Sequence, residues 1–178
     1  MLKQNEQKVI QKVLDGNTEA FGLLVERYHK GLCIYLINLV HDEMLAEDIA
    51  QESFLQAFRK LETYNLNYSF STWLYRIARN KALRYIEKSK NNITHYDTDA
   101  IEQPITSSPH DEATKEEQRK QIQQIIRKLK PEYQEVIILY YWNAKTYEEI
   151  SEIIDRPVNT VRTWLHRSKE SIRKELYG

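Results

Sequence analysis

Residues 146–167, Thr-Tyr-Glu-Glu-Ile-Ser-Glu-Ile-Ile-Asp-Arg-Pro-Val-Asn-Thr-Val-Arg-Thr-Trp-Leu-His-Arg, predict two helices joined by a short turn. Thr146 and Glu149 stand at the spacing of a capping box, so a helix should begin there and carry its isoleucines inward. Pro157 then starts a second helix, in which Val161 and Leu165 repeat at a spacing of four. The opposite side of this second helix carries Asn159, Thr160, Arg162, Thr163, His166 and Arg167. Such a polar side suits the major groove of DNA, as in a helix-turn-helix, and the alternative is a solvated amphipathic hairpin.

Charge is distributed unevenly along the chain. The 178 residues carry 26 basic and 26 acidic side chains, so the formal net charge is zero. Residues 72–90 nevertheless hold six basic residues against Glu87 alone, and residues 156–178 hold six against Glu170 and Glu175. Because local charge matters more than the sum, two separate basic segments predict two contacts with nucleic acid.

Composition excludes several classes of protein. Cys33 is the only cysteine, which excludes a disulfide framework and a zinc cluster built on thiolates and favours a reducing compartment. A secretory signal and a run of about 18 apolar residues are both missing, so we expect a cytoplasmic protein without membrane insertion. With four glycines in all, the chain has no glycine-rich phosphate loop. We therefore predict no nucleotide-dependent enzyme and no cofactor.

Apolar periodicity predicts helices throughout the first half of the chain. Gly16 should end a short first helix, and Asn17 or Thr18 should cap a second that carries an apolar stripe to Leu39. Asp42 should cap a third helix. Its core-facing residues are Leu45, Ile49, Ala50, Phe54, Ala57, Phe58 and Leu61, and its polar stripe is Asp48, Gln51, Glu52, Gln56 and Arg59. Ser69 or Ser71 should cap a fourth, basic helix that runs to about Lys88 and turns Arg76, Asn80 and Arg84 to one side.

Between these helices and the C-terminal ones lies an acidic segment. Residues 91–117 contain seven acidic residues and one lysine, with Pro104 and Pro109, which is typical of a flexible linker. Strand-like alternation is absent. The predicted fold is therefore all-α, with two small helical domains, 1–90 and 118–178, joined by the linker 91–117, and the second domain ends in the helix-turn-helix.

Aromatic residues crowd the start of the basic helix, at Tyr64, Tyr68, Phe70, Trp73 and Tyr75. They are either core residues or, together with the polar loop of Asn65, Asn67 and Ser69, a platform for unpaired DNA bases. A splayed base needs both a stacking surface and a polar pocket for its edge. The residues alone leave both interpretations open.

A metal site is the remaining possibility that single motifs raise. Glu26 and His29 have the Glu-x-x-His spacing of di-iron bundles, and Glu47 or Glu52 on a neighbouring helix are conceivable further ligands. Such a site needs a second Glu-x-x-His pair, which the sequence lacks. The sequence therefore predicts no metal site, and His41, His95 and His110 have no partners that would make a catalytic group.

Three motifs in order resemble a known family. They are Ala46-Glu47-Asp48-Ile49-Ala50-Gln51-Glu52-Ser53-Phe54, then Phe70-Ser71-Thr72-Trp73-Leu74-Tyr75-Arg76-Ile77-Ala78-Arg79-Asn80, and the closing helix-turn-helix. With the acidic linker between the second and third, they resemble the extracytoplasmic-function (ECF) sigma factors of bacterial RNA polymerase over nearly the whole chain. The resemblance implies a promoter-specificity subunit that is not itself an enzyme.

The resemblance also implies a role for each polar surface. Asp48, Gln51, Glu52 and Arg59 would bind the clamp helices of the largest subunit of core RNA polymerase. The minus-ten promoter element would be opened and read by Tyr64, Asn65, Asn67, Ser69, Thr72, Trp73, Arg76, Arg79, Asn80 and Arg84. The second domain would sit on the polymerase flap and read the minus-thirty-five element with Asn159, Thr160, Arg162, Thr163, His166 and Arg167. An anti-sigma factor, which in this family is often membrane-anchored, is the implied inhibitor.

Two positions depart from the family pattern. Asn159 stands where the family often has glycine, and Trp164 stands where it often has a basic residue. An indole cannot replace a guanidinium at a phosphate or a guanine, so we expect Trp164 to pack against its own domain or the flap. The alternative functions are a free-standing helix-turn-helix regulator with a helical sensory domain and an adaptor that occupies a sigma partner. Neither alternative requires the polar stripe at Asp48 or the second basic helix.

Overall fold

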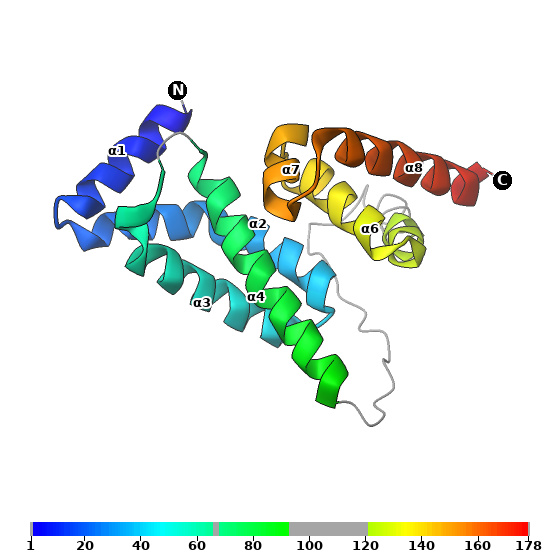
Figure 1. The fold of residues 1–178 in the computed structure, drawn as a ribbon, viewed down its shortest axis with the longest axis horizontal. Helices are drawn as coiled ribbons and strands as arrows, with labels where there is room; N and C mark the ends of the chain where they lie inside the picture. The colour runs from blue at the N-terminus through cyan, green and yellow to red at the C-terminus, as the bar shows by residue number, and fades with distance from the viewer. Residues whose placement is uncertain (1, 66–67, 93–120, 178) are drawn as a thin grey trace, which may run out of the picture.

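The computed structural model describes residues 2–65, 68–92 and 121–177, and within these ranges every regular element is a helix (Figure 1). This confirms the all-α prediction. Most of the predicted linker lies outside the described residues. Its first two residues, 91 and 92, belong to the fourth helix, which extends past the expected Lys88 to Asn92.

Six elements form the N-terminal half. They are α1 (Leu2–Leu14), η1 (Thr18–Phe21), α2 (Gly22–Val40), α3 (Glu43–Arg59), η2 (Leu61–Thr63) and α4 (Phe70–Asn92). Asp42 caps α3 as predicted, because its Oδ1 accepts a hydrogen bond of 2.9 Å from the amide of Leu45. The expected start of the second helix was wrong. Asn17 caps the 3₁₀ turn η1 through the amide of Ala20, and α2 begins only at Gly22.

The core of this half lies where α2, α3 and α4 pack together. Leu32, Leu36, Ile49, Leu74 and Phe70 are almost completely buried there. Phe58, which was expected in the core, is instead 36% exposed and rests its ring against Phe21 at 5.1 Å between centroids. Phe58 lies in the last turn of α3, which ends at Arg59, and its ring covers the edge of the core there.

The C-terminal half contains the predicted helix-turn-helix. A helix over residues 121–128 is followed by α6 (Pro131–Ile137), the π-helical turn η3 (Ile138–Trp142), α7 (Tyr147–Ile154) and α8 (Val158–Tyr177). The capping box of α7 is present, with Thr146 Oγ1 accepting from the amide of Glu149 at 3.1 Å and Glu149 Oε2 accepting from that of Thr146 at 3.0 Å. The helix ends at Asp155, whose left-handed backbone (φ 55°) turns the chain toward α8.

The two halves pack against each other. α7 lies along the first turns of α4, while α6 and η3 lie against α2 (Figure 1). Buried residues from both halves, such as Tyr35 and Val136, belong to one continuous hydrophobic cluster. The described residues therefore form a closed arrangement in which the helix-turn-helix half covers part of α4.

Candidate functional site

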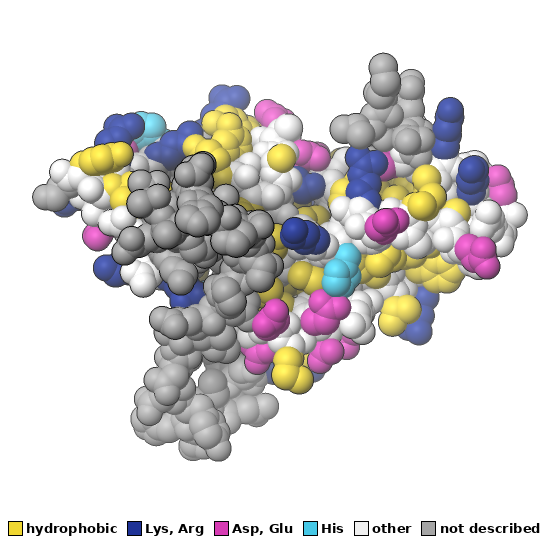
Figure 2. Space-filling model, turned by 180° about the vertical axis from the view of Figure 1, so that it is seen from behind, with side chains coloured by type: hydrophobic (Ala, Val, Ile, Leu, Met, Phe, Trp, Pro, Cys, Tyr) yellow, Lys and Arg dark blue, Asp and Glu magenta, His cyan; other side chains and the backbone are white. Residues whose placement is uncertain are grey.

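The polar stripe on α3 is a solvent-exposed surface. Asp48, Gln51, Glu52 and Arg59 all face water, as predicted. Glu52 accepts a 3.0 Å hydrogen bond from Lys81 Nζ on α4, and this bond lowers the pKa of the Glu52 carboxyl. Figure 2 shows acidic side chains gathered toward the lower edge of the first domain, where α3 lies.

Two apolar residues that sequence reasoning missed lie on the same side of α3. Met44 is 82% exposed and Leu55 is 55% exposed. Their spacing from Asp48 by four and seven residues, respectively, places them among the polar residues of the stripe. We call this surface the α3 face, defined by Met44, Asp48, Gln51, Glu52, Leu55 and Arg59. Exposed apolar residues inside a polar rim are typical of protein–protein interfaces, and helical spacing was the signal that could have revealed them.

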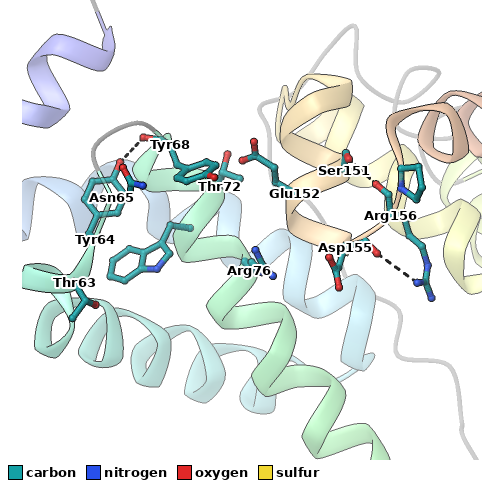
Figure 3. Close-up of a pocket in the computed structure, with 12 residues that line it drawn as sticks. Thr63, Tyr64, Asn65, Tyr68, Thr72, Arg76, Ser151, Glu152, Asp155 and Arg156 are labelled. Atoms are coloured by element: carbon teal, nitrogen blue, oxygen red, sulfur yellow. Dashed lines mark hydrogen bonds between the residues drawn. The ribbon is translucent and has the colours of Figure 1, made fainter.

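The aromatic loop and the start of α4 line a cleft of about 560 Å³ (Figure 3). Tyr64 and Trp73 lie with ring centroids 5.1 Å apart, and Asn65 and Arg76 lie on the same wall. The far wall comes from the helix-turn-helix, including Glu152 and Arg156. With Thr72, the structure thus brings five of the residues predicted to read the minus-ten element to this cleft, whereas Asn67 lies outside the described residues.

Trp73 is both a core residue and part of the wall of the cleft. Its ring is half-buried and packs against the core, between Tyr64 and Phe70. It also lines the cleft. Tyr64 is held in place by a hydrogen bond of 2.6 Å from its hydroxyl to the carbonyl oxygen of Tyr68. The loop aromatics are therefore an edge of the core that remains accessible from the cleft.

Farther along α4, the residues predicted to contact DNA divide into two groups. Arg76, Asn80 and Arg84 are exposed, as expected for residues that contact DNA. Arg79, predicted to belong with them, instead pairs with Glu135 on α6, with Nε 2.7 Å from Oε1 and Nη2 3.2 Å from Oε2. Tyr35 donates a further hydrogen bond of 2.6 Å to the same carboxylate. Arg79 therefore serves the domain interface in this arrangement.

Ser69 and Thr72 are occupied in the same way. Both hydroxyls donate to Glu149 Oε1 on α7, at 3.1 and 3.2 Å. Burial raises the pKa of Glu149, but the Thr146 amide, Lys145 and these two hydroxyls outweigh it and hold the pKa below its usual value. Thr72 is also almost completely buried. Three residues predicted to read the minus-ten element are thus engaged by the second domain.

Lys145 completes the interface. Its ammonium donates a 2.6 Å hydrogen bond to Ser71 Oγ and lies 4.6 Å from the centre of the Tyr75 ring. Burial lowers its pKa. The Tyr75 hydroxyl donates to Asn143 Oδ1 at 2.6 Å. We call these contacts, with those of Glu135 and Glu149, the closed interface.

The residues of the second domain in this interface were not among the predicted site residues. A charged residue at a buried position requires a partner, and Glu135, which immediately precedes the apolar run from Val136 to Leu139, has only 8% of its surface exposed. The position of Glu135 beside that run could have indicated a buried carboxylate in need of a partner. The identity of the partner was not available from local pattern, because Arg79 is 56 residues away in the chain.

On α8 the predicted reading side is open to solvent. Asn159, Arg162, Thr163, His166 and Arg167 are exposed, and Thr160 is half-buried. Arg162 lies over the ring of Tyr147 at 5.8 Å, which holds its guanidinium near the turn. Trp164 is half-buried and packs against the core of its own domain, in agreement with one of the two positions expected for it.

Comparisons with known proteins identify the family of this chain. The family models for sigma-70 region 2 and sigma-70 region 4 match residues 24–92 and 119–172. The chain is similar to the ECF RNA polymerase sigma factor SigW of Bacillus subtilis, with 36% identity covering 95% of each chain. It is also similar to the ECF RNA polymerase sigma-E factor of Escherichia coli K12, with 32% identity covering 94% of this chain and 92% of that one.

A solved structure shows the same fold. The sigma factor RpoE of Bartonella quintana, crystallised with the anti-sigma factor NepR, superposes with a TM-score of 0.73 over 88% of this chain and 96% of that one, at 18% identity. The two family models and the two relatives show that the chain is a bacterial transcription initiation factor of the sigma-70 class. The chain belongs to the ECF sigma factors of that class. In the residues that the structure describes, no helix has the length and apolar character needed to cross a membrane.

Proposed function

We propose that this protein binds core RNA polymerase and directs it to a specific set of promoters in the cytoplasm. The main observation in support of this proposal is that one chain presents three exposed surfaces in the order that this task requires. These are the α3 face, the loop and exposed side of α4, and the outer side of α8. A helix-turn-helix regulator would use only the third. No cofactor enters this function.

Each surface has chemistry that fits its task. The α3 face mixes carboxylates with Met44 and Leu55, which suits a basic and partly apolar protein surface such as the polymerase clamp helices. Tyr64, Trp73 and Asn65 offer rings and an amide to an unstacked base in the minus-ten element. Arg162 and its neighbours on α8 are open to the major groove of the minus-thirty-five element.

Because of the closed interface, this function requires the two domains to separate. Promoter DNA cannot reach Ser69, Thr72 and Arg79 while Glu149 and Glu135 occupy them. Docking on polymerase therefore has to separate the two domains, so that each reaches its own promoter element. A partner of the anti-sigma type, membrane-anchored or not, would inhibit the protein by holding the domains closed or by covering the α3 face.

Reconstitution tests the proposal directly. The full chain would be added to core RNA polymerase and genomic DNA fragments from the same organism, and the transcripts that appear would be mapped. We expect new start sites that share a minus-thirty-five and a minus-ten element. Binding of duplex DNA without core polymerase, together with unchanged transcripts when core is present, would instead support the free-standing regulator.

We expect Arg162→Ala to weaken binding to the upstream element and to relax its sequence preference, because a base-reading arginine discriminates by about 1–3 kcal/mol. Arg167→Ala should weaken binding without changing the preference and reduce the salt dependence, as loss of a phosphate contact does. Filter binding of holoenzyme to substituted promoters measures both effects. Arg173→Ala, an exposed residue farther along α8, serves as the matched control. A template whose minus-ten region is already unpaired should suffer less from these substitutions than duplex DNA. Equal losses on the two templates would contradict the assignment.

Substitution of the loop should affect DNA opening rather than polymerase binding. Flipping a base costs a few kcal/mol, which the loop has to recover by stacking and by hydrogen bonds to the base edge. We therefore expect Asn65→Ala and Asn67→Ala together to slow open-complex formation and to change base preference at one minus-ten position. Permanganate footprinting on substituted promoters provides the measurement, with Glu62→Ala as the control outside the cleft. Unchanged melting and unchanged preference would remove the loop from the mechanism.

A further inference from the structure

Three side chains with metal-binding chemistry meet on the flank of the first domain. His29 and Cys33 are one turn apart on α2, and Glu47 reaches them from α3. The ligand atoms of all three lie within 4.8 Å of one another. None of them belongs to the α3 face, the cleft or the closed interface.

The three side chains are close enough together to bind one metal ion after a small movement of Glu47. His29 Nε2 lies 3.7 Å from Cys33 Sγ and 2.9 Å from Glu47 Oε1, and Cys33 Sγ lies 3.2 Å from Glu47 Oε2. Zinc bonds of about 2.3 Å to sulfur and about 2.0–2.2 Å to nitrogen and oxygen require ligands about 3.4–3.6 Å apart at tetrahedral angles. The nitrogen–sulfur separation fits this requirement, and each Glu47 oxygen lies closer to its own partner than the requirement states, so rotation of the half-exposed Glu47 carboxylate would bring one of its oxygens to the metal.

From this geometry we propose that His29, Cys33 and Glu47 form a binding site for a divalent transition-metal ion, with Zn²⁺ as the natural occupant. One imidazole, one thiolate and one carboxylate are donors that zinc accepts together, and three protein ligands leave a fourth position for water. On binding, the Cys33 thiol transfers its proton to solvent and its sulfur bonds the metal. The metal joins α2 to α3 in place of the hydrogen bonds that now connect the three side chains.

The lack of a second Glu-x-x-His pair excludes a di-iron centre and does not exclude a site of another composition. The spacing of four between His29 and Cys33 indicates a metal site only when a third ligand from another helix is known. The packing of α2 on α3 supplies Glu47. Gln51 donates a 3.2 Å hydrogen bond to Glu47 and so orients the carboxylate toward the other two ligands. The inference does not depend on the proposed function.

Cobalt titration of the full chain tests the site, because Cys33 is the only thiol in the protein. The metal-free protein would be titrated with Co²⁺, and we expect a thiolate-to-cobalt charge-transfer band together with the intense visible bands of tetrahedral cobalt. Zn²⁺ should abolish both at one equivalent. Loss of a group that merely orients a ligand costs about 10- to 100-fold in affinity, so Cys33→Ser, His29→Ala and Glu47→Gln should each cost at least that much.

Two controls keep the result decisive. His166→Ala removes an exposed histidine that also pairs with a glutamate four residues away, at 3.4 Å, and it should leave the titration unchanged. In the unmodified protein, Zn²⁺ should slow alkylation of Cys33 by at least tenfold and a chelator should restore the rate, which requires no variant to fold. Absence of the charge-transfer band, or equal affinity in wild type and Cys33→Ser, would overturn the proposal.

Discussion

The double variant Asp48→Lys/Glu52→Lys should lose at least about 100-fold in affinity for core RNA polymerase while keeping its helical content. Both side chains are exposed on the α3 face, so neither substitution disturbs the core. Placing like charges against each other in an interface costs several kcal/mol, and each 1.4 kcal/mol is a factor of ten in the dissociation constant. Fluorescence anisotropy of labelled protein titrated with core polymerase measures the loss.

Glu52 requires one additional check. It accepts from Lys81, so a lysine at position 52 also introduces repulsion inside the first domain. The single variant Asp48→Lys avoids that contact and should still weaken binding by at least tenfold. Glu19→Lys/Glu26→Lys makes the same change of charge elsewhere in the domain, at two exposed residues, and should bind normally. Normal binding by a well-folded Asp48→Lys/Glu52→Lys protein would exclude the α3 face from the polymerase interface.

Glu135→Lys should open the closed interface. The substitution removes the acceptor shared by Arg79 and Tyr35 and sets an ammonium against the guanidinium. Both members of the ion pair are largely buried, with 18% and 8% of their side chains exposed, and breaking such a pair costs about 3–5 kcal/mol. Small-angle X-ray scattering should show an increased radius of gyration. Binding to a single-stranded minus-ten oligonucleotide without core polymerase should also increase, since Arg79, Thr72 and Ser69 become accessible.

Charge exchange provides the sharpest control for this result. Arg79→Glu should open the interface as well, and the double variant Arg79→Glu/Glu135→Arg should close it again, because the pair is restored with its charges reversed. Glu132→Lys makes the same change on α6 beside the interface and should leave the dimensions of the protein unchanged. Unaltered scattering from Glu135→Lys would mean that the remaining contacts, at Lys145 and Glu149, hold the domains together without the ion pair.

The parts of the fold that could be predicted from the sequence depend on neighbouring residues. Asp42 and Thr146 cap their helices because the amide that each one satisfies lies three residues away. The failure at α2 is also local. Asn17 is a cap, as predicted, but its bond to the Ala20 amide closes a 3₁₀ turn that buries Phe21 before the α-helix begins. Residue type alone does not distinguish these two kinds of helix start.

The residues of the candidate site likewise divide into those that local sequence could predict and those that depend on packing. Exposure of Asp48 and Arg162 follows from helical periodicity, so the α3 face and the outer side of α8 could be predicted. Burial of Thr72 and Arg79 could not, because periodicity places them beside Arg76 and says nothing about a second domain packing over them. The choice of Glu135 and Glu149 as partners depends on how the domains pack together. Cys33 and Glu47 likewise meet only through the packing of two helices.

The pair of Arg79 and Glu135 has a genetic consequence. Arg79 stabilises the closed interface and, in the proposed function, also contacts promoter DNA, whereas Glu135 contributes its contacts with Tyr35 and Arg79 to the closed interface and has no proposed contact with DNA. A selection for mutants that transcribe without the inducing stimulus should therefore recover substitutions of Glu135 and not of Arg79. Alleles at position 79 should be recovered as loss of function, because the released protein lacks a DNA contact. Alleles with opposite phenotypes would then map to two residues that touch each other.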